Sequence, residues 1–114
     1  GENHSLYACR AALELAYVMR DAGYYVRAGV ASGNVVSGRI GSRLGKLDYT
    51  VMGDTVNLAA RLKIEAAKAG TTGIVVAPST IRGLRGQGRV AFIERVEIKG
   101  KSREYPLYEL LELR

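Results

Sequence analysis

The stretch DYTVMGDTVNLAAR, residues 48–61, predicts a β-strand that passes directly into an α-helix. Its first half contains Tyr, Thr and Val, which are residue types that favour strands. Gly53 and Asp54 mark the junction, and Asp54 is a suitable N-cap for a helix that we expect to run to about Ala69, before Gly70. The buried side of this helix is expected to carry small and aliphatic residues, namely Leu58, Ala59, Leu62 and Ala66.

Two polar residues, Asn57 and Arg61, lie outside that apolar stripe. They are four positions apart, so their side chains share one face of the helix. Asn57 is near the helix start, where unpaired N–H groups favour an anion, and Arg61 adds a planar fork of donors that suits a phosphate. The pair can hold a ribose oxygen and a phosphoryl group. The alternative is an asparagine that caps the helix and an arginine that is merely solvated.

Upstream of this stretch, the pattern predicts a helix and then a hairpin. Apolar residues recur with helical spacing over residues 4–22, at Leu6, Cys9, Leu13 and Ala16, and Gly23 is a natural stop. Residues 24–33 alternate with period two, and a turn at Ser32-Gly33-Asn34 leads into residues 34–41. A polar loop, residues 42–46, is expected to lead into the next strand.

Downstream, strands are predicted at residues 73–77, 89–98 and 106–113, with a short helical turn at residues 79–84 that Ser79 caps. The order helix, hairpin, strand, helix, strand and terminal hairpin predicts an α+β, ferredoxin-like fold, with an antiparallel-rich sheet and flanking helices. Because the chain opens directly on a helix, either its fold is compact and unusual, or the chain is a piece of a larger domain and the N-terminal strands of such a sandwich are missing from it.

Composition and net charge limit the classes of protein to which this chain can belong. At 114 residues, with 47% hydrophobic and 25% charged residues, the chain is expected to form a single globular domain. Its net charge of +6 is spread along the chain without a recognition motif, so we expect no nucleic-acid partner. Charged residues interrupt each apolar run, which predicts no membrane contact by this segment. Cys9 falls on the apolar helix spacing and is interpreted as a small buried side chain.

Four blocks, GVASGNVVSGRIGS, LDYTVMGDTVNLAARL, GIVVAPST and VEIKGKSREYPLYEL, follow one another along nearly the whole chain. Together they strongly resemble the nucleotidyl cyclase catalytic domain of class III adenylate and guanylate cyclases. The resemblance implies that residues 1–114 are the C-terminal portion of a single nucleotide cyclase catalytic domain. It also implies a part in converting ATP to 3′,5′-cyclic AMP and pyrophosphate.

The resemblance assigns roles to the polar residues of these blocks. Asn57 and Arg61 would be the catalytic residues, which orient the ribose and stabilise charge on the α-phosphate during attack by the 3′ hydroxyl. Thr50 falls at the position that contacts the purine. A small hydroxyl residue there, rather than the cysteine typical of guanylate cyclases, favours ATP as the substrate.

Three further cations are candidates for contacts to phosphate. Lys99 corresponds to the lysine that contacts the triphosphate. Arg43 and Lys46 lie in the loop where the family often places another phosphate-binding cation, and the alignment does not choose between them. The alternative for Lys99 is a surface hairpin turn that is simply basic, and the alternative for Thr50 is an ordinary strand threonine.

The resemblance also implies two divalent cations, Mg²⁺ or Mn²⁺, held by two aspartates upstream of the first helix. The chain contains neither aspartate, and Asp21, Asp48 and Asp54 do not stand in the family's metal-binding context. We therefore expect no metal ligands in this chain and no turnover of ATP by the chain alone.

The implied partners are ATP and either a second copy of the chain or a second cyclase domain, in the cytoplasm. The alternative is a non-catalytic cyclase-homology module that serves nucleotide binding or dimerisation. The intact pair of Asn57 and Arg61 favours the enzyme, because a structural descendant has no physical need for it.

Overall fold

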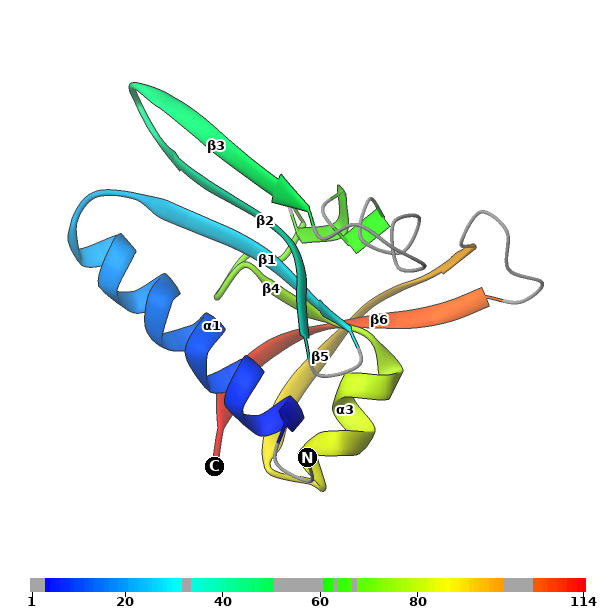
Figure 1. Cartoon of the computed structure of the whole chain (residues 1–114). Coiled ribbons are helices and arrows are strands. Elements are labelled where there is room, and N and C mark those ends of the chain that lie inside the picture. The colour runs from blue at the N-terminus through cyan, green and yellow to red at the C-terminus, as the bar shows by residue number, and fades with distance from the viewer. Residues whose placement is uncertain (1–3, 32–33, 51–60, 63, 67, 98–103) are drawn as a thin grey trace.

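The computed structural model describes residues 4–31, 34–50, 61–62, 64–66, 68–97 and 104–114 (Figure 1). Its helices are α1 (His4–Asp21) and α3 (Pro78–Leu84). Its strands are β1 (Tyr25–Ala31), β2 (Asn34–Ser42), β3 (Gly45–Thr50), β4 (Ile74–Val76), β5 (Gly88–Glu97) and β6 (Glu104–Leu113). Residues 61–62 and 64–66 are also helical, and together they are called the Arg61 helix below. The fold is α+β, as the sequence predicts.

The described strands form one six-stranded sheet in the order β3-β2-β1-β4-β6-β5. All neighbouring strands run antiparallel except β1 and β4, which are parallel, with Val30 opposite Val76. A parallel pair needs a crossover connection, which here is the long segment between the two strands. The antiparallel-rich sheet is therefore confirmed, whereas the parallel contact at its centre has no local signal in the sequence.

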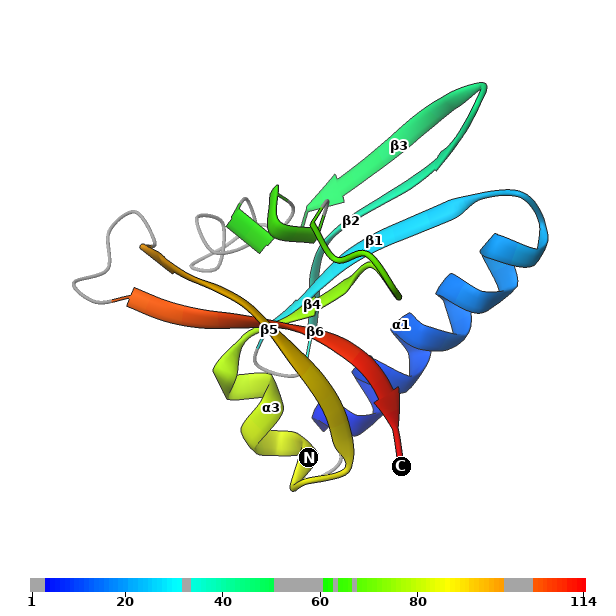
Figure 2. The same ribbon diagram turned by 180° about the vertical axis from the view of Figure 1, so that it is seen from behind.

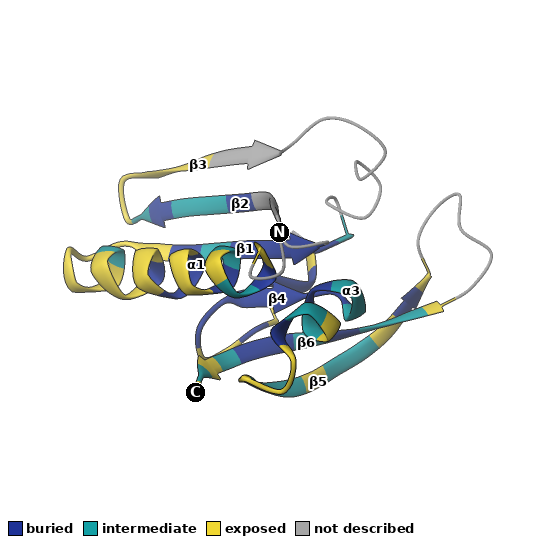
Figure 3. Cartoon of the chain, turned by 60° about the horizontal axis from the view of Figure 1, so that its bottom comes forward, coloured by how far each residue is buried: buried dark blue, intermediate teal, exposed yellow. Residues whose placement is uncertain are grey.

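Helical segments cover both faces of the sheet (Figures 1 and 2). Side chains alternate between the two faces of a strand, and β4 shows the result. Ile74 and Val76 belong to the apolar cluster beneath α1 and α3, whereas Val75 belongs to the cluster beneath the Arg61 helix. All three are fully buried, and Figure 3 shows β4 as a buried strand in the middle of the molecule.

Helix α1 packs with the face that its spacing predicts. Cys9, Leu13 and Ala16 are buried, while Leu6 is half-buried against the same cluster. The helix ends at Asp21 because Gly23 takes a φ of 90°, which closes the last turn through a bond from its N–H to the Arg20 carbonyl. Cys9 is 0% exposed, which confirms the interpretation of this residue as a small buried side chain, and this burial raises its pKa to about 11.

Two local predictions need correction. Residues 42–46 are not a polar loop, because β2 and β3 continue to a tight turn in which Ser42 pairs with Gly45. Nor does Ser79 cap α3, since this helix begins at Pro78 and its N-cap position is Ala77, without a side-chain cap. Proline suits the first helical position because its missing N–H would have no partner there.

One buried carboxylate fixes the segment that leads into β4. Glu109 Oε2 accepts the backbone N–H groups of Thr71, Thr72 and Gly73, at 2.8, 2.7 and 3.3 Å. Gly73 has a φ of 77°, and a Cβ at this position would lie 2.5 Å from the Val26 carbonyl oxygen. The segment is thus held by β6 on one side and pressed against β1 on the other, which sets the position of β4 between them.

Glu109→Gln is expected to lower the free energy of unfolding by about 1–2 kcal/mol, because three N–H groups lose a charged acceptor. Urea unfolding of the two proteins measures the difference. Glu112→Gln is the matched control on the same strand: Glu112 is 52% exposed and pairs with Arg89, so a change within about 0.5 kcal/mol is expected. Equal losses for the two variants would contradict the role of Glu109.

Candidate active site

The Arg61 helix brings a cation and a carboxylate together. Arg61 Nε donates a hydrogen bond to Glu65 Oε1 at 3.1 Å, across one helical turn. The Arg61 side chain is 36% exposed, whereas that of Glu65 is fully buried. Arg61 therefore stands at the edge of the core, with one side held by the protein and part of its surface open to solvent.

The local sequence explains why a glutamate is buried here. Leu62, Ala66 and Ala69 are buried in the cluster beneath the Arg61 helix, against side chains that include Val75. Glu65 follows Leu62 by three positions and so belongs to the same helix face. The sequence interpretation missed Glu65. Its position between the apolar residues, four after Arg61, was the available signal.

Two more side chains complete an ion-pair cluster, which consists of Arg61, Glu65, Lys68 and Glu94. Lys68 Nζ lies 3.4 Å from Glu65 Oε1 and also donates a hydrogen bond to Glu94 on β5. Lys68 is 52% exposed and Glu94 is 37% exposed. The cluster therefore runs from the buried face of the helix out to the surface of β5, with two cations against two carboxylates.

The surroundings shift the pKa values of Glu65 and Glu94 in opposite directions. Burial raises the pKa of Glu65, and the neighbouring carboxylate of Glu94 raises it further, whereas Lys68 opposes the change. The pKa of Glu94 is lowered, first by its hydrogen bond from Lys68 and then by Glu65. When the two carboxylates compete for one proton, Glu65 is therefore the site that takes it.

The other predicted site residues fall at different places. Asn57 and Lys99 lie outside the described residues. Thr50 is the last residue of β3, paired in the backbone with Ser37, and this end of β3 points toward the Arg61 helix in both views (Figures 1 and 2). Arg43 and Lys46 are exposed at the opposite end of the β2–β3 ribbon. Within this chain, neither cation is brought to Arg61, and their phosphate role stays a prediction.

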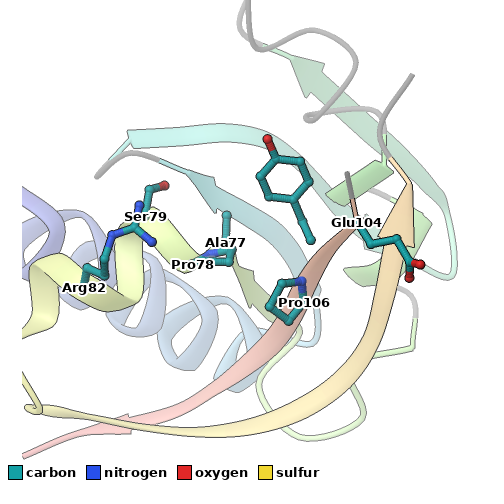
Figure 4. Close-up of a pocket in the computed structure, with 7 residues that line it drawn as sticks. Ala77, Pro78, Ser79, Arg82, Glu104 and Pro106 are labelled. Carbon is teal, nitrogen blue, oxygen red and sulfur yellow. The ribbon is translucent and has the colours of Figure 1, made fainter. Parts of the chain in front are cut away.

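A surface pocket lies where α3 and β6 begin (Figure 4). Its lining residues are Ala77, Pro78, Ser79, Arg82, Glu104, Tyr105 and Pro106. Of the proposed site residues that the structure describes, namely Arg43, Lys46, Thr50 and Arg61, none lines it. Tyr105 connects the pocket to the Arg61 helix, because it also packs against the apolar cluster that contains Leu62.

The described residues do not fit a divalent cation. They contain no group of three histidine, cysteine, aspartate or glutamate side chains close enough to share a metal ion. The carboxylates of Glu65 and Glu94 are both paired with Lys68. In the described part of the chain, no helix is long and apolar enough to cross a membrane.

Known proteins resemble this chain in sequence. Residues 6–111 match the family described as the Adenylate and Guanylate cyclase catalytic domain. Adenylate cyclase 1 of Rhizobium meliloti is 28% identical over an alignment 118 residues long, which covers 95% of this chain but 17% of that protein. An uncharacterised protein of Mycobacterium tuberculosis is 44% identical over 55 residues, which are 48% of this chain and 9% of that protein.

Two solved structures share the fold. One is the catalytic core of a rhodopsin-guanylyl cyclase with converted specificity in complex with ATPalphaS, at a TM-score of 0.59 and 23% identity. The other is the guanylate cyclase domain of RhGC from Catenaria anguillulae in complex with GTP, at a TM-score of 0.57 and 22% identity. Each alignment covers 98% of this chain and 60% or 62% of the other. The chain thus spans less than two thirds of each of these proteins.

The matched residues include all four sequence blocks in full, and the fold agrees with that of the two cyclase domains. The chain belongs to the adenylate and guanylate cyclase catalytic domain family.

Proposed function

We propose that this chain is part of an adenylate cyclase that converts ATP to 3′,5′-cyclic AMP and pyrophosphate. In this proposal it supplies residues for the purine, the triphosphate and the transition state. The aspartates that hold Mg²⁺ or Mn²⁺ belong to residues outside this chain. The partner is a second copy or a second cyclase domain, as the family resemblance implies.

The observation that carries the proposal is the state of Arg61. Its guanidinium is tied through Nε to a buried carboxylate, and its side chain is still 36% exposed. A cation held in this way keeps its orientation when a ligand arrives, and so loses little conformational entropy on binding. Preorganised donors of this kind stabilise charge that develops during a reaction.

The proposed chemistry is an internal displacement within ATP. The ribose O3′ forms a bond to the α-phosphorus and loses its proton, while the bond to the leaving pyrophosphate breaks. Negative charge builds on the oxygens around the α-phosphorus, and Arg61 donates hydrogen bonds to this charge. Asn57 orients the ribose, and Lys99, with Arg43 or Lys46, contacts the triphosphate.

Two features favour ATP over GTP. Thr50 is a small hydroxyl residue at the purine position, and Adenylate cyclase 1 of Rhizobium meliloti is one relative that aligns over most of this chain. A hydroxyl group both donates and accepts, so it can pair with the amino group and ring nitrogens of adenine.

The complete natural protein that contains this segment, assayed with ATP or GTP and with Mg²⁺ or Mn²⁺, tests the proposal. We expect cyclic AMP as the main product, with kcat/KM for ATP at least about tenfold above that for GTP, a difference of about 1.4 kcal/mol. A preference for GTP would contradict the substrate assignment. Binding of ATP without any cyclic product would support the non-catalytic module instead.

A further inference from the structure

Glu65 is an unusual residue for the place it occupies. It is fully buried in a helix face that otherwise carries Leu62, Ala66 and Ala69. No N–H or O–H donor of the described residues reaches its second oxygen, Oε2. Replacing a buried ion pair by apolar residues of similar volume is often neutral or stabilising, so stability is a weak reason for a glutamate here.

The hydrogen bond between Glu65 and Arg61 involves one particular nitrogen of the guanidinium. The hydrogen bond to Arg61 is made by Nε, at 3.1 Å. A guanidinium is planar, so a bond at Nε fixes the plane of the whole group. That bond does not use the end of the fork formed by Nη1 and Nη2, which is the part that binds two oxygens of a phosphate.

The carboxylate is itself held in place. Lys68 Nζ lies 3.4 Å from Glu65 Oε1, on the same oxygen that accepts from Arg61. Lys68 also bonds to Glu94, so it connects the end of the Arg61 helix to β5. Two cations therefore converge on Oε1 of Glu65, and the lysine anchors the arrangement to the sheet.

Taking the proposed function as its basis, we propose that Glu65 is a positioning residue that orients the guanidinium of Arg61 toward the reacting phosphate. Glu65 contacts no substrate and acts only through the Nε bond. Lys68, which is paired with Glu94, holds the Glu65 carboxylate where it accepts the hydrogen bond from Arg61. Burial and Glu94 raise the pKa of Glu65, and Lys68 opposes the change.

Glu65→Met in the complete natural protein separates this role from a structural one. Methionine fills a similar volume but accepts no strong hydrogen bond, while Arg61 and Lys68 are exposed enough to be solvated without the carboxylate. We expect turnover of ATP to fall about 10- to 100-fold with KM changed less than about threefold, since a misaligned donor acts on the transition state. The thermal midpoint is expected not to fall.

Two further variants make the test specific. Glu65→Gln keeps an amide oxygen that accepts from Nε, so it is expected to recover most of the turnover. The double variant of Glu65→Met with Arg61→Ala is expected to be no slower than Arg61→Ala alone, because Glu65 acts through Arg61. Glu112→Gln, an exposed carboxylate on β6, serves as the control with unchanged turnover.

The outcomes distinguish the inference from the function on which it rests. Normal turnover in Glu65→Met beside slow turnover in Arg61→Ala overturns the inference alone. Normal turnover in Arg61→Ala overturns the proposed function. If Glu65→Met does not fold, nitrogen-15 NMR of the arginine side chains in the wild type decides: the Arg61 Nε–H is expected to exchange slowly with solvent, and fast exchange overturns the inference.

Discussion

Arg61→Ala is expected to lower turnover of ATP by about 10²- to 10³-fold, because it removes a preorganised donor from charge that develops in the transition state. KM for ATP is expected to change less than about threefold, since this interaction is made chiefly in the transition state. Steady-state rates of cyclic AMP formation by the complete natural protein measure both quantities. The assay temperature must lie well below the unfolding midpoint of the variant.

Arg89→Ala is the matched control for this experiment. Arg89 is also an arginine paired with a glutamate, at 2.9 Å from Glu112, but it is 55% exposed on β5. Its removal is expected to leave turnover unchanged. If Arg61→Ala retains near-normal turnover, Arg61 is a solvated helix residue and its catalytic assignment is wrong.

The structure also changes the expected effect of Arg61→Ala on stability. From spacing alone, its replacement by alanine is expected to cost little stability. The buried carboxylate of Glu65 changes this expectation, because the variant loses a hydrogen-bond donor to Oε1. Lys68 remains within 3.4 Å of that oxygen and limits the loss.

Leu62→Ala is expected to lower the free energy of unfolding by about 2–5 kcal/mol, the cost of deleting a fully buried aliphatic side chain and leaving a cavity. Leu62 is 0% exposed and packs in the cluster with Val75, Val96 and Leu107. The loss falls on the contact between the Arg61 helix and the sheet. Urea unfolding measures the change.

Ile64→Ala gives the comparison on the same helix. Ile64 is 57% exposed, so its truncation removes little buried area and is expected to cost less than about 1 kcal/mol. A similar loss for Leu62→Ala and Ile64→Ala would mean that the Arg61 helix does not pack as described. Normal turnover per folded molecule in Leu62→Ala would separate the packing role of this helix from its chemistry.

Much of the fold follows from short-range patterns. The spacing of Cys9, Leu13 and Ala16 predicts the buried face of α1, and period-two alternation predicts the hairpin of β1 and β2. The final hairpin of β5 and β6 is likewise predicted at nearly its observed bounds. Each of these features depends on residues that are close together in the sequence, so a periodic pattern of apolar residues predicts it directly.

The candidate site follows less completely from the sequence than the fold does. Sequence motifs identified the family and pointed to Asn57, Arg61, Thr50 and Lys99, together with Arg43 and Lys46 as alternatives. Of these, Arg61 is the residue whose side-chain contacts are described within the helical part of the site. The sequence did not point to Glu65, because a glutamate on a helix is expected to face solvent.

The sequence by itself determined the order of the described elements, the family and the apolar face of α1, since all of these depend on local spacing and motifs. Only the tertiary structure decided the parallel contact of β1 with β4, the burial of Glu65 and the bond network of Glu109. Glu109 meets Thr72 across 37 positions of the chain, and Lys68 meets Glu94 across 26. Whether a carboxylate is solvated or buried depends on the partners that folding brings to it, and those partners lie far away in sequence.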